Sequence, residues 1–120
     1  MAKAQTAILE ALDTVLRERR DADATESYVA SLYAKGLNKI LEKVGEEATE
    51  VILAAKDNSG EPGPGGAGAD ALVGEVADLW FHTLVLLAQQ GLSSRDVLER
   101  LDDRFGLSGH AEKAARDVRA

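Results

Sequence analysis

The chain has 120 residues, no cysteine and a formal net charge of −7. Its length predicts a single domain, residues 1–120, with one hydrophobic core. The absence of cysteine excludes thiol nucleophiles, iron–sulfur clusters and cysteine-ligated zinc, and it fits a reducing cytoplasm. The excess of acidic residues argues against nucleic acid and anionic membranes as partners, because both bind basic surfaces.

Apolar residues recur at spacings of three and four along nearly the whole chain, which predicts helices and no strand. The first helix is expected over about residues 5–20, with one apolar stripe made of Ile8, Leu9, Leu12, Val15 and Leu16. A short helix over about residues 26–34 follows, and Thr25 is its expected N-cap.

The next helix, expected over about residues 37–56, has the clearest amphipathic pattern in the chain. Its apolar side chains share one stripe, which consists of Leu37, Ile40, Leu41, Val44, Ala48, Val51, Ile52 and Ala55. A second stripe contains only charged residues, namely Lys39, Lys43, Glu46, Glu47 and Glu50.

Residues 57–70 hold five glycines and both prolines of the protein, which predicts an irregular connector. The run from Gly63 to Gly66 is not a phosphate-binding loop of the common kind, because it follows a helix instead of a strand and lacks the G-K-[S/T] sequence.

Residues 71–90 are predicted to form a helix whose apolar side chains point in nearly every direction. Such a helix belongs inside a bundle or at an oligomer interface. No stretch approaches the roughly 18 apolar residues of a membrane-spanning helix, and the N-terminal residues lack the apolar segment of a signal peptide. We therefore expect no membrane association and a cytoplasmic location.

Ser93 and Asp96 have the spacing of a capping box for a last helix that runs to about Phe105. Residues 106–120 form a C-terminal tail. Together these elements predict an all-α fold, an antiparallel bundle of about four to five helices, with a core that includes the aromatic residues Tyr28, Tyr33, Trp80 and Phe81.

Two acidic residues, Glu75 and Asp78, interrupt the apolar helix 71–90 and lie three apart on one face. Carboxylates persist in such a place only when cations, metals or hydrogen-bond donors compensate them. The connector lets this helix lie antiparallel to the preceding one, so that Glu47 and Glu50 can converge on the same point. Two carboxylates about 4 Å apart repel by about 4 kcal/mol at an effective dielectric near 20, so four of them require a cation.

Oxygen ligands favour a hard ion, Mg²⁺ or alternatively Mn²⁺, and Mg²⁺ commonly recruits phosphate. The pattern therefore predicts chemistry on a phosphate ester or anhydride. Lys39 and Lys43 are candidates to contact phosphate oxygens. Without the acidic cluster, i,i+4 pairing of Lys43 with Glu47 and simple solvation of Lys39 would be the favoured explanation. His82 lies on the stripe of the two acids, and a supporting or packing role is favoured over zinc binding, because cysteine is absent and His110 is the only other histidine.

Several blocks of the chain closely resemble the phosphoribosyl-ATP pyrophosphohydrolase family. They are Ser27 to Leu32 (SYVASL), Lys39 to Val51 (KILEKVGEEATEV), Ala54 to Lys56 (AAK), Glu75 to His82 (EVADLWFH), Leu84 to Leu87 (LVLL) and, in the tail, Ser108 to Arg116 (SGHAEKAAR). The K-V-G-E-E-A-x-E block together with E-x-A-D-L-x-F-H is specific to the family. The E-x-x-E and E-x-x-D motifs alone mark the wider superfamily of all-α, MazG-like nucleotide pyrophosphohydrolases.

The resemblance implies the second step of histidine biosynthesis, in which phosphoribosyl-ATP is hydrolysed with Mg²⁺ to phosphoribosyl-AMP and pyrophosphate. It also implies a MazG-like bundle completed by dimerisation, as a homodimer or higher homo-oligomer, and a stand-alone form without a fused cyclohydrolase. The implied metal ligands are Glu47, Glu50, Glu75 and Asp78. Glu46 matches an extra acid of the motif, so Glu46 and Glu47 are the candidates for orienting or deprotonating water. The basic tail residues Lys113 and Arg116 are weaker candidates than Lys39 and Lys43 for binding the triphosphate.

Two other functions stay open at this point. A house-cleaning pyrophosphohydrolase of non-standard nucleoside triphosphates would share the metal ligands but not the substrate. A non-catalytic helical dimerisation module would carry the acidic stripe only as a solvated face. The blocks outside the metal motif favour the biosynthetic enzyme.

Overall fold

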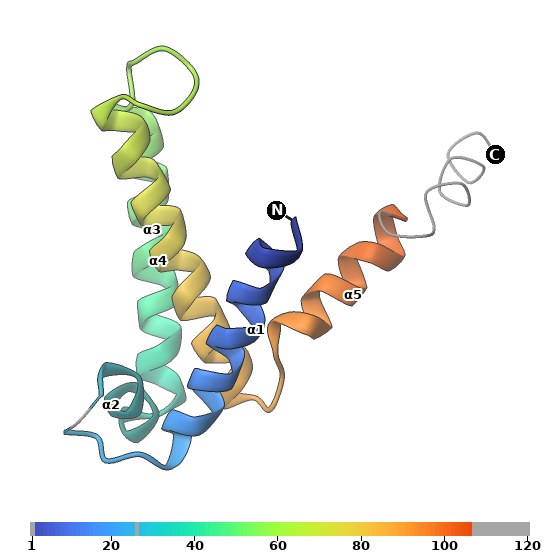
Figure 1. Ribbon diagram of the computed structural model, residues 1–120. Helices are drawn as coiled ribbons and strands as arrows, with labels where there is room; N and C mark the ends of the chain where they lie inside the picture. Colours follow the sequence, from blue (N-terminus) through green and yellow to red (C-terminus); the bar gives the residue numbers. More distant parts are fainter. Residues whose placement is uncertain (1, 26, 107–120) are drawn as a thin grey trace.

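The computed structural model describes residues 2–25 and 27–106, and within these ranges the chain is helical with no strand. The elements, shown in Figure 1, are α1 (Ala2–Glu18), the short 3-10 helix η1 (Arg19–Asp21), α2 (Tyr28–Lys35), α3 (Leu37–Asp57), α4 (Ala67–Gln89) and α5 (Ser94–Phe105). The predicted all-α bundle is thereby confirmed.

Helices α3 and α4 form a long antiparallel hairpin, which is the most extensive packing in the molecule (Figure 1). The other helices gather at the end of the hairpin opposite to the connector. The core lies at this end and contains Leu16 of α1, Val29 and Leu32 of α2, Ile40 of α3, and Leu84, Val85 and Ala88 of α4. The hydrophobic core therefore lies at one end of the hairpin, and the middle of the hairpin can carry polar side chains.

Gly36 joins α2 directly to α3. Its φ of 96° lies in a region that side-chain-bearing residues rarely adopt. The chain can reverse there without a longer loop, because Gly36 serves both as the C-cap of α2 and as the N-cap of α3.

The connector is shorter than its composition predicts. The prediction of residues 57–70 is wrong at both ends, because α3 continues through Asp57 and α4 already begins at Ala67. Asp70 lies in the first turn of α4, where its charge suits the helix dipole, and its backbone N–H donates to the Gly66 carbonyl at 2.9 Å. Gly68 packs so closely on Asn58 that a Cβ would lie 3.2 Å from the Asn58 Cα, so a larger residue would not fit at this position of the helix.

The start of α2 also differs from the expectation. Ser27, not Thr25, is the N-cap, and its Oγ accepts the Ala30 N–H at 3.2 Å. The Thr25 N–H and hydroxyl instead donate to the side chain of Asp23 at 2.9 and 2.8 Å. Thr25 is therefore engaged in a local turn before the helix.

The N-terminus of α5 is capped twice. The predicted capping box of Ser93 and Asp96 is confirmed, with the Ser93 N–H donating to Asp96 Oδ2 at 2.9 Å. In addition, Asp13 of α1 accepts the Ser94 N–H at 3.0 Å and the Ser94 hydroxyl, and both residues are buried. Asp13 therefore ties α5 to α1 through the unsatisfied donors at a helix start.

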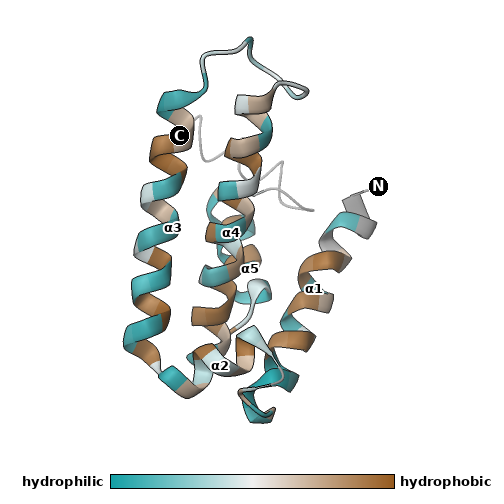
Figure 2. Cartoon of the chain, turned by 90° about the vertical axis from the view of Figure 1, so that its left-hand side faces the viewer, coloured by the Kyte–Doolittle hydropathy of each residue, from teal (hydrophilic) through white to brown (hydrophobic). Residues whose placement is uncertain are grey.

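The helix α4 is less buried than its apolar composition suggests. Trp80 and Val73 are 60% and 67% exposed in the single chain, and Figure 2 shows apolar residues along α1 and α4. Of the aromatic residues assigned to the core, Phe81 and Tyr33 pack against it, whereas Trp80 and Tyr28 are exposed. The described residues thus do not bury α4 on all sides.

By length and composition α4 resembles a membrane-spanning helix, which contradicts the expectation that no stretch would do so. This resemblance is weak support for a membrane location, since the core helix of a water-soluble bundle has the same features.

We predict that Asp13→Ala lowers the free energy of unfolding by about 1–2 kcal/mol, the usual effect of losing a helix cap. Asp13→Asn keeps an acceptor and should cost less. Urea unfolding followed by circular dichroism measures both, with Asp103→Ala on the exposed side of α5 as the control. An effect of Asp13→Ala no larger than that of the control would contradict the capping role.

Candidate metal centre

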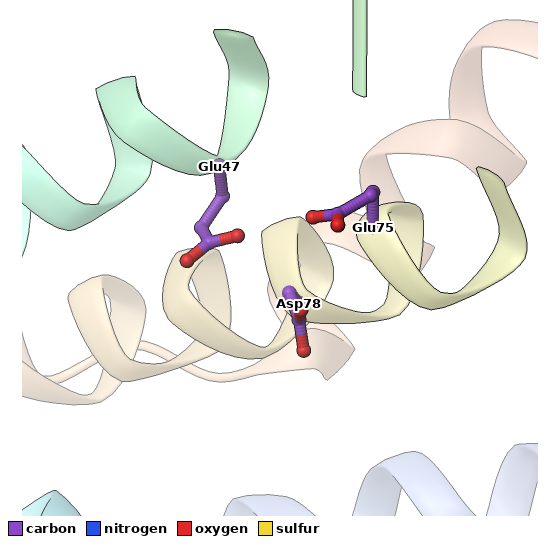
Figure 3. Close-up of side chains that lie close together, drawn as sticks. All are labelled: Glu47, Glu75 and Asp78. Carbon is purple, nitrogen blue, oxygen red and sulfur yellow. The ribbon is translucent and has the colours of Figure 1, made fainter. Parts of the chain in front are cut away.

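Three carboxylates converge in the middle of the hairpin. Glu47 of α3 and Glu75 and Asp78 of α4 each place one carboxylate oxygen within 4.8 Å of the others. Figure 3 shows Glu47 and Glu75 turned toward one another across the space between the two helices. The three-residue spacing puts Glu75 and Asp78 on one face of α4, and the antiparallel packing brings Glu47 opposite them, so the predicted convergence of these three is confirmed.

The fourth predicted ligand, Glu50, lies beside Glu75. A hydrogen bond between their side chains raises the pKa of the Glu75 carboxyl, and burial and the negative charges of Glu50, Asp78 and Glu47 act in the same direction. Two carboxyl groups can share a hydrogen bond only when one of them holds a proton. The Glu75 carboxyl therefore keeps its proton to a higher pH than an ordinary glutamate does.

The cluster fits a divalent cation. Glu47 is 7% exposed, and its Oε2 is buried without a hydrogen-bond partner in the part of the chain that the structure describes. Glu75 Oε2 is unpartnered in the same way. Unpaired buried carboxylate oxygens are costly, and carboxylate oxygens are the ligands that Mg²⁺ and Mn²⁺ prefer.

A cavity of about 300 Å³ adjoins the cluster on the side of the connector. Its acidic lining residues are Glu50, Asp57 and Glu75, and the rest of the lining comes from Leu53, Ala54, Gly68 and Ala71. The side chains of Glu50 and Glu75 are therefore open to a ligand from this side.

Lys43 stands at the opposite edge of the cluster. Its Nζ lies 3.1 Å from Glu46 Oε2 and 3.9 Å from Glu47 Oε1. The hydrogen bond between Lys43 and Glu46 raises the pKa of the lysine and lowers that of the glutamate. Both groups are thus charged at neutral pH, and the ion pairing weighed as the alternative to phosphate binding is present.

Of the remaining predicted site residues, Lys39 is the one that the structure describes. Lys39 pairs with Glu42 on the same helix at 3.4 Å. Lys113 and Arg116 lie outside the described residues.

His82 occupies a supporting position next to the carboxylates. It is 6% exposed, its Nδ1 lies 2.8 Å from the Asp78 carbonyl oxygen, and its Nε2 lies 2.9 Å from the Tyr28 hydroxyl. The sequence did not point to Tyr28 as part of the site, because it is 54 residues from His82 and lies on another helix. Only the packing of α2 beside α4 joins the two.

The raised pKa of Glu75 makes the metal-free protein sensitive to pH. A carboxyl whose pKa in the folded state lies above the ordinary 4.5 stabilises the fold at low pH, and that contribution is lost as the pH rises through the raised value. We predict that Glu75→Gln, measured in EDTA at about pH 7.5, has a higher thermal midpoint than the parent and that the difference shrinks toward about pH 4.

Glu99→Gln on the exposed side of α5 is the matched control and should leave the midpoint unchanged. A lower midpoint for Glu75→Gln in EDTA at the higher pH would contradict the assigned repulsion.

Comparisons with known proteins identify the family of the chain. The model of a family described as phosphoribosyl-ATP pyrophosphohydrolase matches residues 9–105, which include all four carboxylates. A curated protein of Hydrogenovibrio crunogenus (strain DSM 25203 / XCL-2), named phosphoribosyl-ATP pyrophosphatase, is 59% identical over 109 residues. The aligned region covers 91% of this chain and 92% of that relative.

Proposed function

The chain belongs to the phosphoribosyl-ATP pyrophosphohydrolase family, and we propose that it hydrolyses phosphoribosyl-ATP to phosphoribosyl-AMP and pyrophosphate with Mg²⁺ held by Glu47, Glu50, Glu75 and Asp78. It is thus a hydrolase of histidine biosynthesis, and we place its reaction in the cytoplasm. The observation that carries the metal assignment is the convergence of the acidic cluster with two buried, unpartnered carboxylate oxygens.

The reaction adds water across the anhydride bond between the α and β phosphates and releases pyrophosphate. Mg²⁺ bound by the cluster would offset negative charge on the phosphates and on the departing pyrophosphate. The chain itself contributes positioning, because α3 and α4 hold the carboxylates on rigid helices.

Glu46 and Glu47 are the proposed groups for orienting water or accepting its proton. Glu46 is exposed, and its lowered pKa keeps it ionised at neutral pH. Lys43 is proposed to exchange its contact with Glu46 for phosphate oxygens when substrate binds, and this exchange would release the Glu46 carboxylate. Lys39, Lys113 and Arg116 are proposed as further contacts to the triphosphate.

The first experiment measures pyrophosphate release from phosphoribosyl-ATP with Mg²⁺ and with EDTA, beside a panel of standard and modified nucleoside triphosphates. Turnover of phosphoribosyl-ATP that requires Mg²⁺ is the expected result. Preference for another triphosphate would retain the metal site but replace the substrate, and inactivity of folded protein on all of them would favour a non-catalytic helical module.

We predict that Glu50→Gln and Asp78→Asn each lower kcat/KM for phosphoribosyl-ATP by about 100-fold or more, the usual loss when one charge-stabilising group of a site is removed. Both changes keep the shape of the side chain, so circular dichroism should show an unchanged fold. Glu99→Gln serves as the control, and full Mg²⁺-dependent activity of either site variant would refute the ligand assignment.

We also propose that two copies of the chain associate through the exposed apolar residues of α1 and α4. A groove of about 490 Å³ between these helices is lined by Ile8, Leu9, Leu12, Trp80, Phe81 and Leu84, with Gln5 and Ala77 at its margins. Ile8 is 65% exposed and Trp80 is 60% exposed. Exposed apolar areas of this kind commonly mark interfaces.

Ile8→Glu is predicted to shift the protein from dimer to monomer in sedimentation velocity, because it places a charge in the apolar groove. Ile8→Val is the matched control and should stay dimeric. A monomeric parent protein at micromolar concentration would contradict this interface.

A further inference from the structure

We propose that Tyr28 and His82 are positioning residues for the metal centre. Tyr28 holds the buried imidazole of His82 with the hydrogen on Nδ1, and this imidazole keeps Glu47 oriented with Oε2 free to bind the cation. The inference rests on the proposed function, because it concerns how the chain prepares the carboxylate cluster for Mg²⁺.

Both ring nitrogens of His82 are engaged. A backbone carbonyl oxygen can only accept, so the 2.8 Å contact with the Asp78 carbonyl places the hydrogen on Nδ1. Nε2 is then the acceptor for the Tyr28 hydroxyl at 2.9 Å. These two contacts select one tautomer and one orientation of the ring.

Aromatic packing prevents the ring from turning. The rings of Tyr28 and Phe81 both lie edge-on to the imidazole, with centroids 5.9 and 5.1 Å away and interplanar angles of 85° and 87°. With 6% exposure, His82 has no room to flip without moving these neighbours.

The orientation of His82 bears directly on Glu47. Nδ1 lies 3.9 Å from Glu47 Oε1, and Lys43 Nζ lies 3.9 Å from the same oxygen. The positive side of the N–H dipole and the lysine charge both attract Oε1. The other oxygen, Oε2, is buried and unpartnered among the described residues, so the two contacts leave this oxygen for the metal.

The position of Tyr28 suits it to this role, although its side chain is not buried. It is the first residue of α2 and is 52% exposed, so its ring contributes little to the core, while its hydroxyl reaches across to α4. Removal of a group that hydrogen-bonds to or orients a metal ligand typically weakens metal binding by about 10- to 100-fold. The Tyr28 hydroxyl is therefore expected to matter for metal binding much more than for folding.

The test titrates the full-length chain with Mg²⁺ alone and follows the thermal midpoint. For Tyr28→Phe we expect the Mg²⁺ concentration at half-maximal stabilisation to rise by about 10-fold, while kcat at saturating Mg²⁺ stays within about two-fold. Tyr33→Phe is the matched control, because it removes the hydroxyl that donates to the Leu16 carbonyl at 2.9 Å, away from the cluster. It should lower the midpoint without changing the Mg²⁺ dependence.

A second pair of variants tests whether Tyr28 acts through His82. His82→Asn retains an N–H near the position of Nδ1 but loses the atom that Tyr28 contacts. Adding Tyr28→Phe to His82→Asn should therefore cause no further change in the Mg²⁺ midpoint. Independent, additive effects of the two changes would overturn the proposal.

Long-range ¹H–¹⁵N NMR of the imidazoles provides a readout that needs neither metal nor substrate. The chain has two histidines, so His110→Gln assigns the His82 signals. We expect His82 to carry its hydrogen on Nδ1 both in the parent protein and in Tyr28→Phe, because the Asp78 carbonyl is retained, and we expect the Nε2 chemical shift to move in Tyr28→Phe, because this nitrogen loses the hydroxyl that it accepts. Protonation of His82 at Nε2 in the parent protein overturns the proposal.

The outcomes separate this inference from the proposed function. A parent protein that is stabilised by Mg²⁺, together with an unchanged Mg²⁺ midpoint in Tyr28→Phe, overturns the positioning role and leaves the metal centre in place. A parent protein with no response to Mg²⁺ contradicts both.

Discussion

Four carboxylates that repel one another lie in the middle of the α3–α4 hairpin, and the packing of these helices holds them there against that repulsion. The core, with Ile40 and Val85 fully buried, closes the end of the hairpin away from the connector. Only part of the apolar stripe of α3 is covered, because Leu41 and Ile52 are 46% and 62% exposed. The core thus stabilises the fold at one end and allows an unfavourable concentration of charge further along.

The side chains around the cluster reduce the cost of this charge in different ways. Lys43 lies at one edge of the cluster and pairs with Glu46 and more distantly with Glu47. The hydrogen bond between Glu50 and Glu75 raises the pKa of the Glu75 carboxyl, so this group is more readily neutral than an ordinary glutamate. His82 directs an N–H toward the Asp78 carbonyl and lies beside Glu47. None of these contacts occupies Glu47 Oε2 or Glu75 Oε2, so the chain leaves open the oxygens that a divalent cation would need.

The sequence predictions failed where local composition and tertiary contact disagree. Glycine and proline content indicated a connector over residues 57–70, but α4 already begins at Ala67, and Gly68 in its first turn packs closely on Asn58. The apolar residues of α4 indicated burial on all sides, yet Trp80 is 60% exposed, because within residues 2–25 and 27–106 no second element covers it fully. Both errors have the same origin. The composition of a segment indicates which conformations are favourable for it, but it does not indicate which other residues pack against it.

The sequence by itself determined the all-α class, the spacing of Glu47 with Glu50 and of Glu75 with Asp78, and the blocks that mark the family, because helical periodicity and motif spacing are properties of short segments. The tertiary structure alone decided that Glu50 meets Glu75, that Asp13 caps α5, and that Tyr28 reaches His82. Each of these contacts joins residues more than twenty positions apart, and their distances depend on how helices cross, which no local pattern encodes.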